Sequence, residues 1–155
     1  MNIITGSVSI VLFDESSAMQ RIELQRLFHE YADAQNNVGI ALNFQEFASE
    51  VQSLPGKYGM DKNGFVLLAI VNGEWVGCVA LRELTLKSGL ENSNECNVTK
   101  VGEIKRLYVN EAARGNSVGK LLMLELLSQA KKRCFTHLFL DTCARYFIFL
   151  SGFLI

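Results

Sequence analysis

Residues 103–122 read EIKRLYVNEAARGNSVGKLL, and this stretch decides how the rest of the chain is interpreted. Together with the two residues before it, its first part is an apolar-rich run over Val101–Val109 that is typical of a β-strand. A short segment with a glycine at position 115 follows and leads directly into a helical pattern. The first turn of a helix has unpaired backbone N–H groups and a partial positive charge. A strand, a short loop and a helix in this order therefore predict a phosphate-binding site.

The residue types in this loop support the same chemistry. Gly115 and Gly119 allow the backbone to approach an anion closely, and Arg114 and Lys120 add positive charge. A Walker A loop would need glycine in place of Arg114 and a hydroxyl residue in place of Leu121. No G-x-G-x-x-G follows any predicted strand, so neither of these nucleotide-binding motifs fits.

The residues after the loop predict a helix and a further strand. One broad apolar helical face is formed by Val118, Leu122, Leu126 and Ala130, with Leu121 and Leu127 beside it. Lys131–Arg133 then complement the negative end of the helix dipole, and Phe135–Leu140 is predicted to be a strand. A strand, a crossover helix and a second strand imply a right-handed β-α-β unit.

Before the loop, the middle of the chain predicts a β-hairpin. The apolar runs Phe65–Val71 and Trp75–Leu81 flank Asn72-Gly73, and both of these turn residues tolerate positive φ. Residues 85–100 are polar and rich in Asn and Ser, and we expect them to form a loop.

The first third of the chain predicts one strand and two helices. Ser7–Phe13 is the strand, and Asp14–Ser17 is a cluster typical of a helix start. Two apolar helical stripes follow, one over Leu24, Leu27, Phe28 and Tyr31, the other over Phe44, Phe47, Ala48 and Val51. We therefore expect a single domain over residues 1–155 with an α/β fold, a mixed sheet and the order β-α-α-β-β-β-α-β.

Composition excludes several classes of protein. Of the 155 residues, 49% are apolar and 20% charged, which is typical of a globular domain, and the net charge of -1 gives no basic field for nucleic acid or anionic membranes. No segment reaches the length of a membrane helix, and residues 1–11 do not resemble a signal peptide. The four cysteines form no C-x-x-C pair, so we expect free thiols and a cytoplasmic protein; they are Cys78, Cys96, Cys134 and Cys143. Only His29 and His137 could supply imidazole ligands, and neither is near a second ligand in the sequence, so we expect no metal site.

The loop and its surroundings resemble a known family. Arg114-x-x-Ser117-x-Gly119 is similar to the Q/R-x-x-G-x-G/A signature of the GNAT N-acetyltransferase superfamily, with serine at the first signature glycine. The chain resembles a small single-domain subgroup of that superfamily over about residues 1–142. The segments that carry this resemblance are 27–31, 44–47, 54–58, 77–82, 103–109 and 138–142.

The resemblance implies a co-substrate and the residues that bind it. Acetyl-CoA would bind the loop that consists of Arg114, Gly115, Asn116, Ser117, Val118, Gly119 and Lys120. Its pyrophosphate would lie on the N–H groups of residues 116–120. Its pantetheine arm would lie along Leu107, Tyr108 and Val109 like an extra strand, and a backbone N–H there would polarise the thioester carbonyl. A primary amine of a small molecule or peptide would attack directly, without an acyl-enzyme, and residues 35–43 would line part of the acceptor pocket.

Glu103 occupies the position that often serves as the general base in this family. The alternative for Glu103 is a structural role, either in an ion pair with Lys105 or Arg106 or as a solvated side chain on the strand. Asp141 is a weaker candidate for the base, because carboxylates at strand ends commonly cap the next loop.

After Thr142 the chain departs from the family, which continues with a helix, a Tyr-x-x-x-Gly-Phe segment and two strands. Residues 143–155 read CARYFIFLSGFLI instead, so we expect the final helix and two strands to be lacking. Tyr146 is a candidate for the tyrosine that serves as general acid in the family, although its spacing from the Gly-Phe pair does not match. The segment carries one charge, Arg145, and we expect it either to seal a homodimer or to fold back onto the core.

Two functions remain open at this point. The first is an N-acetyltransferase that moves the acetyl group from acetyl-CoA to an amine. The alternative is a degenerate acyl-CoA-binding protein that keeps the phosphate loop and has little or no catalysis.

Overall fold

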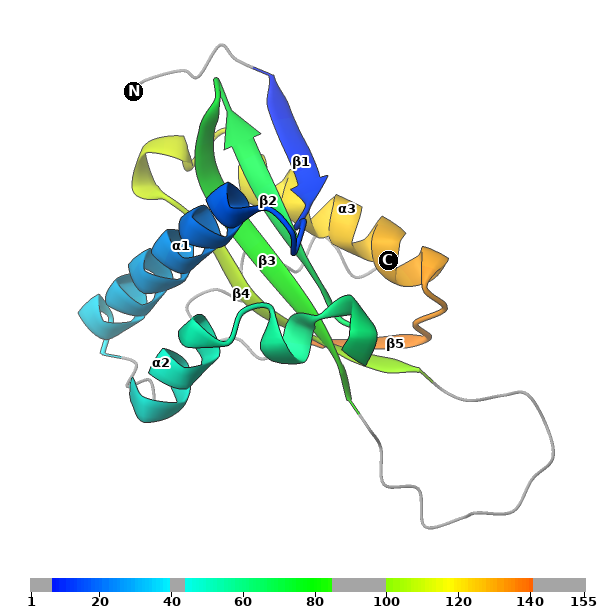
Figure 1. The fold of residues 1–155 in the computed structure, drawn as a ribbon. Helices are drawn as coiled ribbons and strands as arrows, with labels where there is room; N and C mark the ends of the chain where they lie inside the picture. The colour runs from blue at the N-terminus through cyan, green and yellow to red at the C-terminus, as the bar shows by residue number, and fades with distance from the viewer. Residues whose placement is uncertain (1–6, 40–43, 85–99, 141–155) are drawn as a thin grey trace, which may run out of the picture.

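The computed structural model describes residues 7–39, 44–84 and 100–140 and contains the predicted order of elements (Figure 1). In chain order the strands and helices are β1 Val8–Leu12, α1 Ala18–Asn37, α2 Phe44–Gln52, β2 Phe65–Val71, β3 Glu74–Leu84, β4 Val101–Val109, α3 Val118–Lys132 and β5 His137–Leu140. Three short 3₁₀ turns lie between them, two between α2 and β2 at Gly56–Tyr58 and Met60–Lys62, and one between β4 and α3 at Glu111–Ala113.

The five strands form one mixed sheet in the order β1-β2-β3-β4-β5. Neighbouring strands from β1 to β4 are antiparallel, whereas β5 is parallel to β4, and α3 connects these two as predicted for a β-α-β unit. The turn between β2 and β3 has positive φ at both Asn72 and Gly73, at 51° and 83°. The predicted Asn-Gly hairpin is therefore confirmed.

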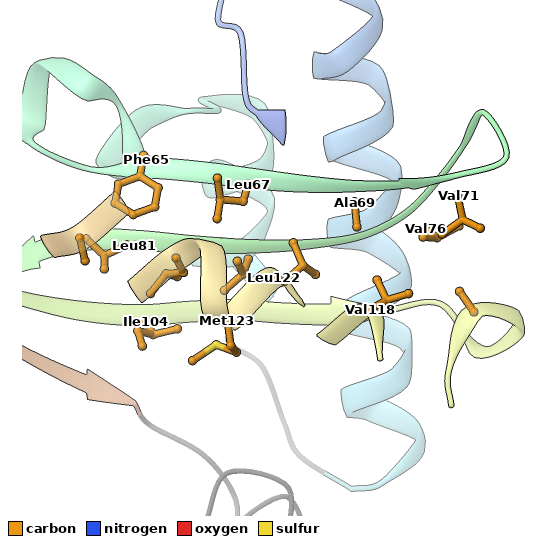
Figure 2. Close-up of a cluster of buried hydrophobic side chains, with 14 residues drawn as sticks. Phe65, Leu67, Ala69, Val71, Val76, Leu81, Ile104, Val118, Leu122 and Met123 are labelled. Carbon is orange, nitrogen blue, oxygen red and sulfur yellow. The ribbon is translucent and has the colours of Figure 1, made fainter. Parts of the chain in front are cut away.

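Helices cover both faces of the sheet, α3 on one face and α1 with α2 on the other (Figure 1). Phe65, Leu67 and Ala69 of β2 lie in the core beneath α3, together with Leu122 of that helix (Figure 2). The alternate residues of the same strand, such as Leu68, lie beneath α1 and α2. A strand buried on both faces needs apolar residues at every position, which explains the unbroken run at 65–71.

Several predicted boundaries shift in the structure. β3 extends to Leu84, and β5 begins at His137 rather than Phe135. Ala48, predicted to lie on the apolar stripe of α2, is exposed, because that helix turns Phe47, Glu50 and Val51 toward the sheet instead. Cys78 and Cys134 are free thiols. The expectations for Cys96, Cys143, Asp141, Tyr146, the 143–155 segment and most of the 85–100 loop concern residues outside the described ranges.

Glu50 joins α2 to β4 through an ion pair that is largely shielded from solvent, with the two side chains 8% and 12% exposed. Its carboxylate accepts hydrogen bonds from Arg106 Nε at 2.8 Å and Nη2 at 3.0 Å, and it also pairs with Lys57. The Tyr58 hydroxyl donates to the same carboxylate at 2.9 Å. Burial alone would raise the pKa of Glu50, but the hydrogen bonds from Arg106 and Lys57 outweigh it and lower the pKa to about 2.

We predict that Glu50→Gln lowers the free energy of unfolding by about 3 kcal/mol at pH 7, because it leaves the Arg106 charge buried without its partner. The pKa of Glu50 is lowered from 4.5 to about 2 on folding, so its contribution is present above the higher value and is lost as pH falls through this range. The difference in the free energy of unfolding between the unmutated protein and Glu50→Gln should therefore become smaller at acidic pH. Urea unfolding at several pH values measures both effects.

The matched control is Glu23→Gln, which removes a carboxylate from an ion pair with Arg26 on the surface of α1. Surface pairs of this kind contribute less than about 1 kcal/mol. If Glu23→Gln and Glu50→Gln lower the free energy of unfolding equally, the Glu50–Arg106 pair stabilises the fold no more than a surface pair.

Candidate active site

The described pairing of β4 with β5 covers only the first part of β4. The pairing between these strands runs from Val101 opposite His137 to Ile104 opposite Leu140. Beyond this point β4 continues for five residues, 105–109, paired with β3 on one side only within the described residues. An edge of this kind offers backbone N–H and C=O groups to a ligand.

A β-bulge lies within this open part of β4. Ala80 is opposite Lys105 and Cys78 is opposite Tyr108, so two β4 residues stand against the single residue Val79 of β3. Arg106 is one of the two and has a φ of 58°, and its carbonyl accepts a hydrogen bond from the Cys78 thiol. Because one extra residue reverses the alternation of a strand, the bulge places Tyr108 on the same face of the sheet as Lys105.

The loop between β4 and α3 ends in an uncapped helix start. Gly115 has a φ of 80° and Ser117, the residue before α3, has a φ of 60°. The first helical hydrogen bond runs from the Leu121 N–H to the Ser117 carbonyl at 3.0 Å, and the Ser117 side chain makes no capping bond. The N–H groups of Val118, Gly119 and Lys120 therefore have no partner within the helix and can bind an anion.

The space beside these groups is open. A Cβ added at Gly119 would lie 3.7 Å from Val109 Cγ2, which is an ordinary contact, and one at Gly115 would meet no atom within 4 Å. Internal packing thus does not require glycine at position 119. A glycine that the protein's own packing does not need, at the start of a helix, fits a ligand that approaches the backbone closely.

The remaining predicted residues gather around this loop and the end of β4. Leu107 and Val109 pack on the α3 face, and Tyr108 packs on the opposite face. Arg114 lies across the end of β4, with its Nε donating to the Val109 carbonyl at 3.0 Å. The amide of Asn116 donates to the carbonyls of Ala113 and Arg114. Lys120 is exposed. The structure thus brings the predicted loop next to the predicted strand edge.

Tyr108 connects the open edge of β4 to α1. Its hydroxyl donates to Glu30 Oε2 at 3.2 Å. Burial and the nearby Glu30 charge raise the pKa of Tyr108 to about 12, so this hydroxyl stays protonated at neutral pH.

Glu103 lies between two cations on the face of the sheet that α1 and α2 cover. It accepts hydrogen bonds from Arg82 Nε at 2.6 Å and from Lys105 Nζ at 3.0 Å, and its side chain is 13% exposed. Burial alone would raise the pKa of Glu103, but the hydrogen bonds from Lys105 and Arg82 outweigh it and lower the pKa. Glu103 is therefore ionised at neutral pH. Of the two ion-pair partners considered from the sequence, Lys105 is present, whereas Arg106 is directed to Glu50.

Sequence reasoning missed the partners Arg82 and Glu50. Arg82 lies directly opposite Glu103 in the β3–β4 register, which no local pattern reveals. For Glu50 a signal was available, because it is a carboxylate on the buried side of an amphipathic helix, between Phe47 and Val51. Carboxylates that are shielded from solvent need a charged partner, so the position of Glu50 in the sequence predicts an ion pair.

Other features contribute nothing to the predicted site. A hollow of about 360 Å³ lies near the turn between β2 and β3 and includes Arg26, Trp75 and Asn110 in its lining, but none of the predicted site residues. Among the described residues, no three His, Cys, Asp or Glu side chains are grouped to hold a metal ion. None of the helices in the described ranges has the length and apolarity to cross a membrane.

Similar proteins are known in several organisms. An uncharacterized N-acetyltransferase of Dictyostelium discoideum is 27% identical over 168 residues, covering 77% of this chain and 76% of that protein. One from Schizosaccharomyces pombe is 28% identical over 120 residues, covering 77% of this chain and 64% of that protein.

Solved structures show the same fold. A predicted acetyltransferase from Clostridium acetobutylicum, crystallised with acetyl-CoA, has a TM-score of 0.70 at 14% identity, over 96% of this chain and 90% of that one. A Trypanosoma brucei acetyltransferase has a TM-score of 0.65 at 16% identity, over 96% of this chain and 92% of that one. The acyltransferase fold expected from the sequence is thereby confirmed. The acetyltransferase (GNAT) family model matches residues 22–146, which is most of the chain, and the protein belongs to this family.

Proposed function

We propose that this GNAT acetyltransferase moves the acetyl group of acetyl-CoA to a primary amine by direct attack. The observation that carries the proposal is the uncapped first turn of α3, which stands beside the open edge of β4. The N–H groups of the first turn suit the phosphates of a coenzyme, and the edge of β4 suits the amide-bearing arm of the same molecule.

The residues present fit acetyl-CoA as a co-substrate. The N–H groups of Val118, Gly119 and Lys120 are available to an anion, because no side-chain cap competes for them. The edge of Leu107–Val109 accepts an extended arm as an added strand, and a backbone N–H on it would polarise the thioester carbonyl. The open space at Gly119 supports close approach of the pyrophosphate.

The acceptor amine must lose a proton, since alkylammonium groups with a pKa of about 10 are mostly charged at neutral pH. We assign this proton to Glu103, directly or through a water molecule. The carboxylate is ionised and lies three residues before the bulge of β4. Both of its oxygens already accept a hydrogen bond from a cation, which lowers its basicity, so we expect it to be a less effective base than an unpaired carboxylate.

The same ion pairs support the second candidate, a degenerate acyl-CoA-binding protein. In that case Glu103 would serve only to neutralise Arg82 and Lys105. Tyr146 as the general acid, the homodimer sealed by residues 143–155 and the cytoplasmic location stay predictions from the sequence.

We predict that acetyl-CoA stabilises the fold and that Gly119→Asp removes most of this effect. A ligand at 100 times its dissociation constant adds about 2.7 kcal/mol to the free energy of unfolding. An aspartate in the first turn of a helix favours the helix itself, so the ligand-free variant should fold, while its charge repels the pyrophosphate. The measurement is the thermal shift with acetyl-CoA.

The control is Leu124→Asp, which adds the same charge on α3 at a side chain that is 46% exposed and outside the first turn. This variant should keep the shift. If the unmutated protein shows no shift with acetyl-CoA, the co-substrate assignment is wrong.

We also predict that Glu103→Gln lowers turnover about 10²-fold while leaving the acetyl-CoA shift nearly intact. The matched control is Glu111→Gln, an exposed carboxylate in the loop after β4, which should keep full turnover. Steady-state rates over a broad amine panel provide the measurement. Unchanged turnover in Glu103→Gln returns this residue to an ion-pairing role, and the absence of turnover in every protein with binding intact favours the degenerate binder.

A further inference from the structure

The side from which an acceptor reaches β4 follows from the position of α3. This helix packs on one face of the sheet, and the anion site proposed above is at its first turn (Figure 1). A coenzyme bound there and along the edge of β4 occupies the α3 side. The acceptor then has to approach from the opposite face, which α1 and α2 cover.

That face carries a group of six charged side chains around the open part of β4, which we call the cationic cluster. Two carboxylates, Glu50 and Glu103, are paired directly with four cations. Glu50 pairs with Lys57 and Arg106, and Glu103 pairs with Arg82 and Lys105. Tyr58 lies between the two halves, because its hydroxyl bonds to Glu50, whereas its backbone and the carbonyl of Leu81, the residue before Arg82, both lie against Gly64.

The cluster has an excess of positive charge, and this excess is on its outer side. The two carboxylate side chains are only 8% and 13% exposed, whereas Lys57 is 38% and Arg82 34% exposed. Within the described residues, Arg82 binds Glu103 through Nε alone, so its two terminal nitrogens remain available. Glu30 on the neighbouring part of α1 accepts a hydrogen bond from Tyr108 and pairs with Arg26, so its charge is already partnered outside the cluster.

We infer that the cationic cluster binds a carboxylate of the acceptor, so that the acceptor is an amine that also carries a carboxylate. The inference rests on the proposed function, since it assigns the substrate class of the same site. Arg82 and Lys57 are the groups that meet the carboxylate, Arg82 with a planar pair of donors that suits its two oxygens.

The test measures acetyl transfer to three pairs of acceptors: glycine, β-alanine and 4-aminobutanoate, each with its primary amide. The amide keeps the length of the molecule and removes the charge, and rates are compared at equal concentrations of the neutral amine. We expect at least one acid to exceed its amide about tenfold in kcat/KM, mainly through KM, because a hydrogen bond to a charged group is worth this much. Amides that match or exceed their acids in every pair overturn the inference.

Two variants locate the effect. Arg82→Gln and Lys57→Gln should each reduce the ratio between acid and amide, and Lys57→Gln leaves Glu103 and its partners untouched. Lys132→Gln makes the same charge change at the end of α3 and should leave the ratio as it is. A general loss of catalysis changes both members of a pair equally, so only a loss of recognition changes the ratio.

The thermal shift with acetyl-CoA is recorded on the same samples. An intact shift without any preference for acids, or without turnover of any acid, overturns this inference and leaves co-substrate binding in place. Absence of the shift contradicts the proposed function itself. A ratio that is unchanged in both cluster variants also overturns the assignment of the carboxylate to Arg82 and Lys57.

Discussion

The contact between Glu50 and Arg106 holds together the parts of the molecule on which the site depends. Arg106 has a left-handed backbone conformation in the middle of a strand, which costs roughly 1–2 kcal/mol for a residue with a side chain. Its guanidinium is fixed by the two hydrogen bonds that it donates to Glu50 of α2, and it lies over the rings of Tyr31 and Phe47, at 5.2 and 5.4 Å from their centroids. These interactions offset the backbone cost and keep the bulge in place. The bulge in turn sets which side chains of β4 face α1 and α2.

The electrostatics of the site come from placement rather than from composition. The chain as a whole has a net charge of -1, and the sequence alone gives no basic field. The structure nevertheless concentrates cations on one face of β4 and unpaired N–H groups at the start of α3. Anionic groups are therefore favoured on both sides of the same strand, although the protein surface in general does not attract them.

Most of the fold could be predicted because its signals are local. The 65–71 run, the Asn72-Gly73 turn and the apolar face of α3 each lie within one stretch of sequence. The strand and the turn have the predicted structure, and the central residues of the helical face are buried as predicted, whereas Leu121 beside them is exposed. The partners in the site could not be predicted in this way. Glu50 and Arg106 are 56 positions apart, and Arg82 and Glu103 are 21 apart. The sequence around Arg106 does not predict the bulge either, because arginine also occurs in regular strands. An even alternation would have put Arg106 and Glu103 on opposite faces of the sheet.

The short pairing of β5 with β4 also has a consequence for how the protein behaves in solution. Over residues 105–109 the described part of the chain leaves one side of β4 without a neighbouring strand. Edges of this kind recruit strands from other molecules and are a common starting point for aggregation. A ligand that lies along this edge as an added strand satisfies the same backbone groups. In the binding mode proposed above, the coenzyme would therefore protect the protein from self-assembly as well as supply the acetyl group, and solubility would depend on the supply of acetyl-CoA.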